Sequence, residues 1–72
     1  GEVVVAHASE WRPCMQHAER LVATAKWRNV PIWVDSASRE LGRLFPNSGL
    51  DKGAIATILR ALVIERGGSL AP

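Results

Sequence analysis

The spacing of apolar residues divides the chain into segments of different predicted structure. Val3 to Ala6 form a β-branched run that ends at His7, a pattern typical of a short strand. From about residue 10 to residue 26, apolar residues recur at steps of three and four, which predicts an amphipathic helix. The expected apolar face of this helix comprises Trp11, Cys14, Met15, Ala18, Leu21, Val22 and Ala25.

Apolar and polar residues alternate from residue 30 to residue 34, which predicts a second strand. Val30, Ile32 and Val34 would lie on one face of that strand, and Pro31 would restrict it to the edge of a sheet. A short helix should follow, with a turn at Pro46-Asn47-Ser48-Gly49 after it. The apolar residues of this short helix are Ala37, Leu41, Leu44 and Phe45.

A longer helix is expected from Lys52 to Arg66, capped by Asp51 and ended by Gly67-Gly68. Leu50 should pack on Ile55 as a hydrophobic staple. Apolar residues cover most of the circumference of this helix, so it needs cover on nearly all sides. We therefore expect it to lie in a homodimer interface, through Ile55, Ile58, Leu59, Leu62 and Val63.

Together these elements predict an α+β fold of a short strand, a helix, a short strand and two helices. We expect one small domain over residues 1–72, with a strand and helix in 1–28, a strand-helix-helix unit in 29–68 and a tail in 69–72. The two strands could pair between chains. They could also pair within one chain, with the helix at 10–26 as a parallel crossover.

Composition limits the cellular compartment and the partners that we expect for the chain. Cys14 is the single cysteine, so no disulfide can form within the chain, and a lone cysteine suits a reducing compartment. No apolar run approaches the roughly 20 residues that span a bilayer, and no signal peptide is recognisable. We expect a cytoplasmic protein without membrane contact. The formal net charge of +2 permits nucleic-acid binding without requiring it.

Residues that could carry chemistry are sparse. The sequence contains no recognisable nucleophile and base pair, no paired carboxylates and no phosphate-binding loop, so we expect no enzyme, no catalytic residue and no cofactor. Cys14 and His17 lie one helical turn apart and could form a reactive thiol or half of a zinc site. A buried thiol beside a surface histidine is the simpler interpretation, and no metal site is predicted.

The segments VPIWVDS, ASRELGRLFPNSG and GLDKGAIATILRAL resemble the ribbon, first helix and second helix of the ribbon-helix-helix repressor superfamily. The resemblance covers residues 29–66. It implies a dimer in which paired ribbons enter the major groove and the second helix is buried between the subunits. It also implies that the start of the second helix, Asp51 to Ala54, anchors a phosphate.

The first functional hypothesis is a homodimeric DNA-binding regulator: a repressor, an antitoxin, or a plasmid or phage accessory factor. Arg28, Asn29 and Trp33 would then contact DNA, with Lys52 near a phosphate. The alternative is a protein–protein adaptor or assembly module without a nucleic-acid role, in which tryptophans form the contact hot spots. A metal or small-molecule sensor that uses Cys14 and His17 is a third interpretation.

Overall fold

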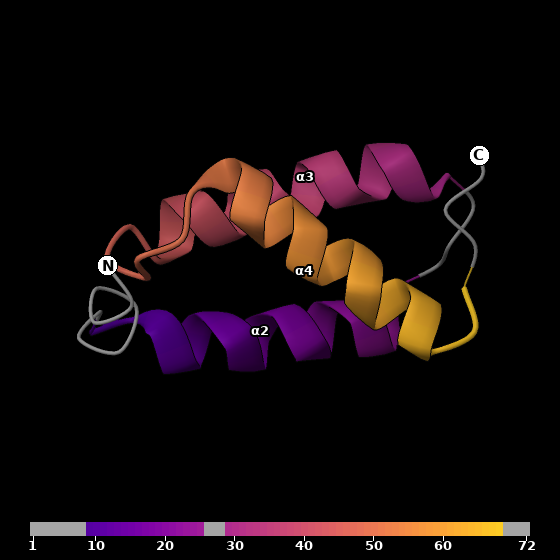
Figure 1. Cartoon of the computed structure of the whole chain (residues 1–72), viewed down its shortest axis with the longest axis horizontal. Helices are drawn as coiled ribbons and strands as arrows, with labels where there is room; N and C mark the ends of the chain where they lie inside the picture. Colours follow the sequence, from indigo (N-terminus) through magenta and orange to yellow (C-terminus); the bar gives the residue numbers. More distant parts are fainter. Residues whose placement is uncertain (1–8, 26–28, 69–72) are drawn as a thin grey trace.

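A computed structural model describes residues 9–25 and 29–68, and this part of the chain consists of three helices and no strand. The helices are α2 (Trp11–Thr24), α3 (Val30–Leu44) and α4 (Lys52–Glu65). Figure 1 shows α2 and α3 running in opposite directions, with α4 crossing obliquely between them; α4 contacts both. The described chain is therefore all-α, and the predicted α+β fold is wrong. The strand expected at 3–6, Arg28 and the tail at 69–72 lie outside the described residues.

The second expected strand, at 30–34, is instead the beginning of α3. The side-chain oxygen of Asn29 accepts a hydrogen bond from the backbone N–H of Ile32 (3.2 Å) and caps the helix. Pro31 lies in the first turn, where its missing N–H breaks no helical hydrogen bond. Val30 and Val34 are both 3% exposed, whereas Ile32 is 67% exposed. A strand would have placed all three side chains on one face with similar burial. Their unequal burial follows the spacing of a helix instead.

The predicted bounds of the other two helices are confirmed to within about two residues. In α4, Asp51 accepts a hydrogen bond on Oδ1 from the N–H of Ala54 (2.7 Å), as expected for its cap. At the other end, Gly67 has a φ of 80°, and its N–H donates to the carbonyl of Ile64 (3.0 Å). The N–H of Gly68 donates to the carbonyl of Val63 (2.9 Å), which completes a Schellman motif.

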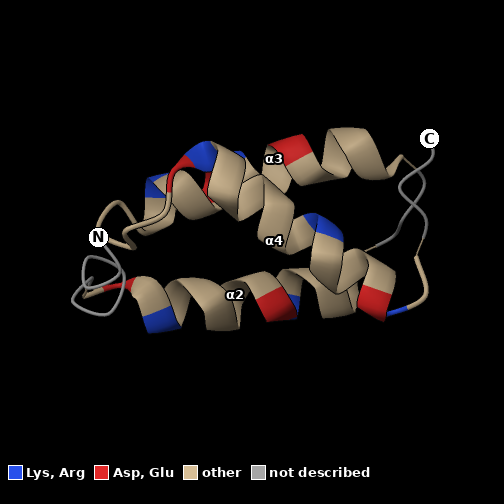
Figure 2. Cartoon of the chain, in the orientation of Figure 1, with Lys and Arg blue, Asp and Glu red and all other residues tan. Residues whose placement is uncertain are grey.

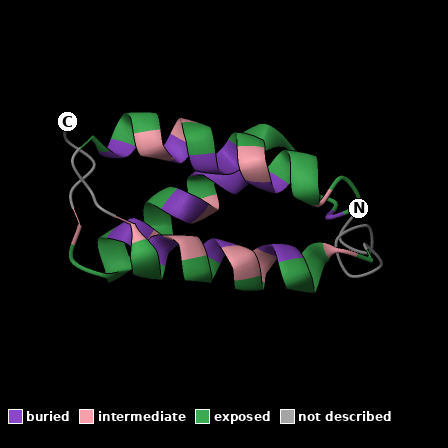
Figure 3. Cartoon of the chain, turned by 180° about the vertical axis from the view of Figure 1, so that it is seen from behind, coloured by how far each residue is buried: buried purple, intermediate pink, exposed green. Residues whose placement is uncertain are grey.

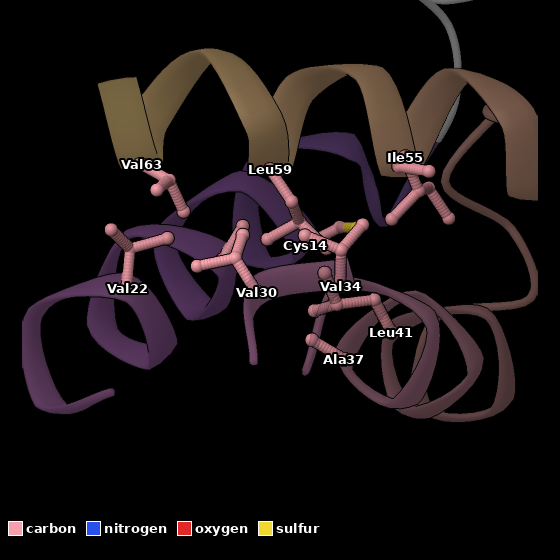
Figure 4. Close-up of a cluster of buried hydrophobic side chains, with 11 residues drawn as sticks. Cys14, Val22, Val30, Val34, Ala37, Leu41, Ile55, Leu59 and Val63 are labelled. Atoms are coloured by element: carbon pink, nitrogen blue, oxygen red, sulfur yellow. The ribbon is translucent and has the colours of Figure 1, made fainter. Parts of the chain in front are cut away.

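All three helices contribute side chains to one core (Figure 4). Figure 3 shows that the buried parts of α2 and α3 face one another across α4. Trp11, expected on the apolar face of the first helix, is 38% exposed. The buried apolar residues are Cys14, Ala18 and Val22 of α2, Val30, Val34, Ala37 and Leu41 of α3, and Ile55, Ala56, Leu59 and Val63 of α4.

Polar contacts hold α2 against the rest of the molecule. At its start, the N–H of Glu10 donates to the carbonyl of Asn47 (3.2 Å), and the N–H of Asn47 donates to the Glu10 carboxylate (2.6 Å). One to two turns later, His17 Nε2 lies 2.9 Å from Glu40 Oε2 of α3, and its ring lies 5.7 Å from that of Phe45. These contacts fix α2 along one side of α3.

The phase of α3 can be tested with two substitutions. We expect Val34→Ala to lower the free energy of unfolding by about 2 kcal/mol, because it removes buried methyl groups and leaves a cavity. Ile32→Ala should change it by less than about 0.5 kcal/mol, because the side chain is largely exposed. Urea unfolding measures both values, and equal losses would instead support a strand with both residues on one buried face.

Candidate interaction surface between α3 and α4

The paired helices α3 and α4 have two seams, and α2 fills one of them. On the α2 side, Glu40 of α3 meets His17, and Leu62 of α4 packs partly buried against the core. The other seam is an open groove with a volume of ≈ 270 Å³, here called the α3–α4 groove. It is lined by Pro31, Val34, Asp35 and Ser38 of α3 and by Lys52, Gly53, Ala56 and Arg60 of α4.

A narrower hollow of ≈ 130 Å³ adjoins the groove beside Val30 and shares Pro31, Val34 and Arg60 with it. The two hollows therefore follow one continuous seam. The apolar residues that line it are Pro31, Val34 and Ala56; Val34 and Ala56 are buried and form its floor, whereas Pro31 is exposed. Ser38 does not make the floor polar, because it is buried and its hydroxyl donates within α3 to the carbonyl of Val34.

Charged side chains line the edges of the groove. Asp35 pairs with Arg39 within α3 and with Lys52 of α4, whose Nζ lies 3.1 Å from Asp35 Oδ1. The hydrogen bond from Arg39, then that from Lys52, and the two positive charges lower the pKa of Asp35. Arg60 is exposed beside the groove and forms no ion pair with any residue that the structure describes. Elsewhere the charges are spread over all three helices rather than gathered into one patch (Figure 2).

Two helical glycines lack a close neighbour among the described residues: Gly53, which lines the groove, and Gly42, which is not one of its lining residues. A Cβ on Gly53 would meet only Asp51 Oδ1, at an ordinary 3.5 Å, and one on Gly42 would meet nothing within 4 Å. Gly42 follows Ser38 by one turn on the same edge of α3. Gly42 lies inside α3, where glycine costs about 1 kcal/mol relative to alanine, whereas Gly53 lies in the first turn of α4; packing against the described residues requires neither glycine.

The residues expected to bind DNA do not gather in one place. Asn29 caps α3. Trp33 is partly buried against the core and lies two turns before Glu40 on the side of α3 that faces α2. Lys52 is the only one of them at the α3–α4 groove, and Arg28 lies outside the described residues.

The five residues expected in a homodimer interface divide into two groups. Ile55, Leu59 and Val63 are buried in the core of this chain, so a second chain could reach them only if the helices separated. Ile58 and Leu62 are partly buried. The large apolar residue of α4 that remains on the surface is Ile64, which is 55% exposed. Self-association itself stays a prediction.

Cys14 and His17 are both engaged inside the fold. Cys14 is 1% exposed; its burial raises the pKa of its thiol, an effect opposed by a hydrogen bond with Ser48 and reinforced by the charge of Glu10. His17 is held by Glu40. Among residues 9–25 and 29–68 there is no group of three or more His, Cys, Asp or Glu side chains that could hold a metal ion.

Several groove residues were not expected from the sequence, notably Asp35, Gly53 and Arg60. A helical period carried from residue 30 to residue 44 would have placed Pro31, Asp35 and Ser38 on one edge of α3. Comparison of the chain with protein-family models, curated proteins and solved structures gives no match. Within the described part of the chain, no helix has the length and apolar character needed to cross a membrane.

Burial makes the Cys14 thiol a reporter of opening of the core. Because the thiol is enclosed and its pKa is raised, we expect it to react with a thiol reagent at least about 100-fold more slowly in the native protein than in urea. The single cysteine makes the assay unambiguous. A native rate close to the urea rate would contradict the placement of Cys14 in the core.

The ion pairs of Asp35 should appear in the pH dependence of stability. A lowered pKa in the folded state means that ionised Asp35 stabilises the fold above its ordinary value of 3.8, and this stabilisation is lost as pH falls through the folded value. Asp35→Asn should therefore unfold at lower urea than wild type near pH 7, and the difference should vanish in strong acid.

Glu19→Gln is the control for that comparison, since it removes the same charge from an exposed position on α2. Its urea midpoint should follow wild type more closely at every pH. If the two variants had the same pH profile, Asp35 would have no specific partners in solution.

Proposed function

We propose that the chain is a protein–protein interaction module that binds a partner segment in the α3–α4 groove. The observation that carries the proposal is an open seam between two helices with an apolar floor and a charged rim. Grooves between helices are a recurrent way to take up another helix, which lays its apolar face on the floor. The exposed side chains of Ile32 and Ile64 offer further apolar contact outside the groove.

The dimensions of the groove favour a macromolecular partner over a small ligand. Small-molecule sites are typically clefts of roughly 300–1,000 Å³ that enclose most of the ligand. The α3–α4 groove, at ≈ 270 Å³, is at the small end of that range and is an open seam rather than an enclosed cleft. A partner that lies across it and continues on both sides would gain more contact than a ligand confined within it. The proposal assigns binding, not chemistry, to this surface.

Binding of duplex DNA by a homodimer remains a prediction. The segment expected to enter the major groove as a ribbon is the start of α3, so the ribbon no longer supports that function. The exposed cations Arg39, Arg43, Lys52 and Arg60 lie on α3 and α4, but Arg39 and Lys52 share the carboxylate of Asp35. Titration with a mixed-sequence duplex at low and high salt tests this function directly.

The proposed function is tested by panning a display library of random peptides, about 16 residues long so that helices can form, against the purified chain. Gly53→Trp fills one end of the groove; the site is exposed and sterically open, and loss of the glycine favours the helix. Ala61→Trp is the matched control, because Ala61 is exposed on α4 and is not among the lining residues of the groove.

We expect enriched peptides to bind wild type and Ala61→Trp equally and to lose at least about tenfold in affinity for Gly53→Trp, a loss of about 1.4 kcal/mol. Thermal unfolding of each variant confirms that the fold persists. If no enriched peptide distinguishes Gly53→Trp from Ala61→Trp, the groove is not a binding surface and the proposal fails.

A further inference from the structure

The charge around the α3–α4 groove is predominantly positive. Asp35 is the one carboxylate among its lining residues, and it is paired with both Arg39 and Lys52. Arg60 has no ion-pair partner among the described side chains. The groove therefore presents positive charge that the described residues leave uncompensated, and a partner with carboxylates would complement it.

The two cations of α4 are placed on either side of the apolar floor. Lys52 and Arg60 are eight residues apart in one helix, which corresponds to about 12 Å along its axis. Ala56 of the floor lies midway between them in the sequence. A partner helix with an apolar patch in the middle and carboxylates about two turns apart would match both features.

The shape of the site also suits a helix. The α3–α4 groove is the seam that α2 leaves open. A partner helix placed there would pack against α3 and α4 on the side opposite α2. Helices pack with axes roughly 8–10 Å apart, closest where side chains are small. Gly53 and Ala56 line the groove, and no contact with the described residues requires the glycine. Close approach of a partner backbone would explain it.

Resting on the interaction function proposed above, we infer that the partner is an acidic amphipathic helix of another protein, seated in the α3–α4 groove with its carboxylates toward Arg60 and Lys52. The apolar face of this helix covers Pro31, Val34 and Ala56. Arg60 is the residue that selects for acidic partners, because Lys52 already shares a carboxylate within the chain.

The test uses two synthetic alanine-based helical peptides of about 16 residues with the same central leucines. One carries glutamates two turns apart on either side of the leucines, and the other carries lysines at those positions. Fluorescence anisotropy measures binding of each labelled peptide to wild type, to Arg60→Glu and to Arg20→Glu. Arg20 is exposed on α2, so its reversal changes the net charge equally without touching the groove.

We expect the glutamate peptide to bind wild type and Arg20→Glu with similar affinity and Arg60→Glu at least about fivefold more weakly. The lysine peptide should not bind wild type, and added salt should weaken the glutamate complex. Failure of the glutamate peptide to bind, equal binding of both peptides, or equal effects of the two reversals would overturn the inference.

Failure of this inference can be told apart from failure of the proposed function. Displayed peptides that depend on Gly53 but lack acidic residues would leave the groove as a binding surface and refute the acidic partner. If a second copy of the chain occupied the groove, the solution mass would be that of a dimer in wild type and of a monomer in Gly53→Trp. A duplex bound more tightly than the glutamate peptide, and lost in Arg60→Glu, would identify nucleic acid as the ligand.

Discussion

The start of α3 at Val30, capped by Asn29, sets the phase of this helix and determines which side chains of residues 30–44 enter the core. Its side chain binds the N–H of Ile32 and starts a helix at Val30, with Pro31 in the turn that tolerates it. Once the helix begins there, Val30 and Val34 enter the core, and Ile32 is left outside. The same phase places Pro31, Asp35 and Ser38 on the edge that lines the α3–α4 groove.

The core depends on that phase and on the apolar character of α4. A chain of 72 residues has a small interior relative to its surface. Most of the apolar surface of α4 is nevertheless buried within the chain, because α4 packs against both α2 and α3. Ile55, Leu59 and Val63 point inward, and Leu62 packs partly buried beside them. The exposed face of α4, which includes Gly53, Arg60 and Ile64, remains for contacts beyond the chain.

Local signals in the sequence predict the structure correctly where they are compatible with only one interpretation. The cap at Asp51, the glycines at 67 and 68 and the three- and four-residue steps of 10–26 each specify one structure, and the helices at Trp11–Thr24 and Lys52–Glu65 agree with them. The five residues from 30 to 34 fit two periods. Alternation places Val30, Ile32 and Val34 together, whereas a helix continues from Val30 and Val34 to Ala37, Ser38 and Leu41. Pro31 fits an edge strand, but the first turn of a helix accepts it equally well.

The residues expected to contact DNA depended on the same ambiguity between strand and helix at 30–34. A ribbon at 30–34 would present Asn29 and Trp33 to DNA, whereas in the structure Asn29 caps α3 and Trp33 packs against the core. Of the expected residues that the structure describes, Lys52 alone lies at the groove. Arg60 and Gly53 could not be foreseen from α4 by itself, because the groove exists only where α4 lies beside α3. Their role comes from packing between helices rather than from a motif.

The most direct measurement is the set of backbone chemical shifts of residues 29–45 by nuclear magnetic resonance. Positive Cα secondary shifts from Val30 through Leu44, with amide protection beginning after the first turn, are what a helix capped by Asn29 requires. Negative Cα secondary shifts from Val30 to Val34, followed by positive ones from Ala37, would mean a strand before a shorter helix. That result would contradict the three-helix core and the groove beside it.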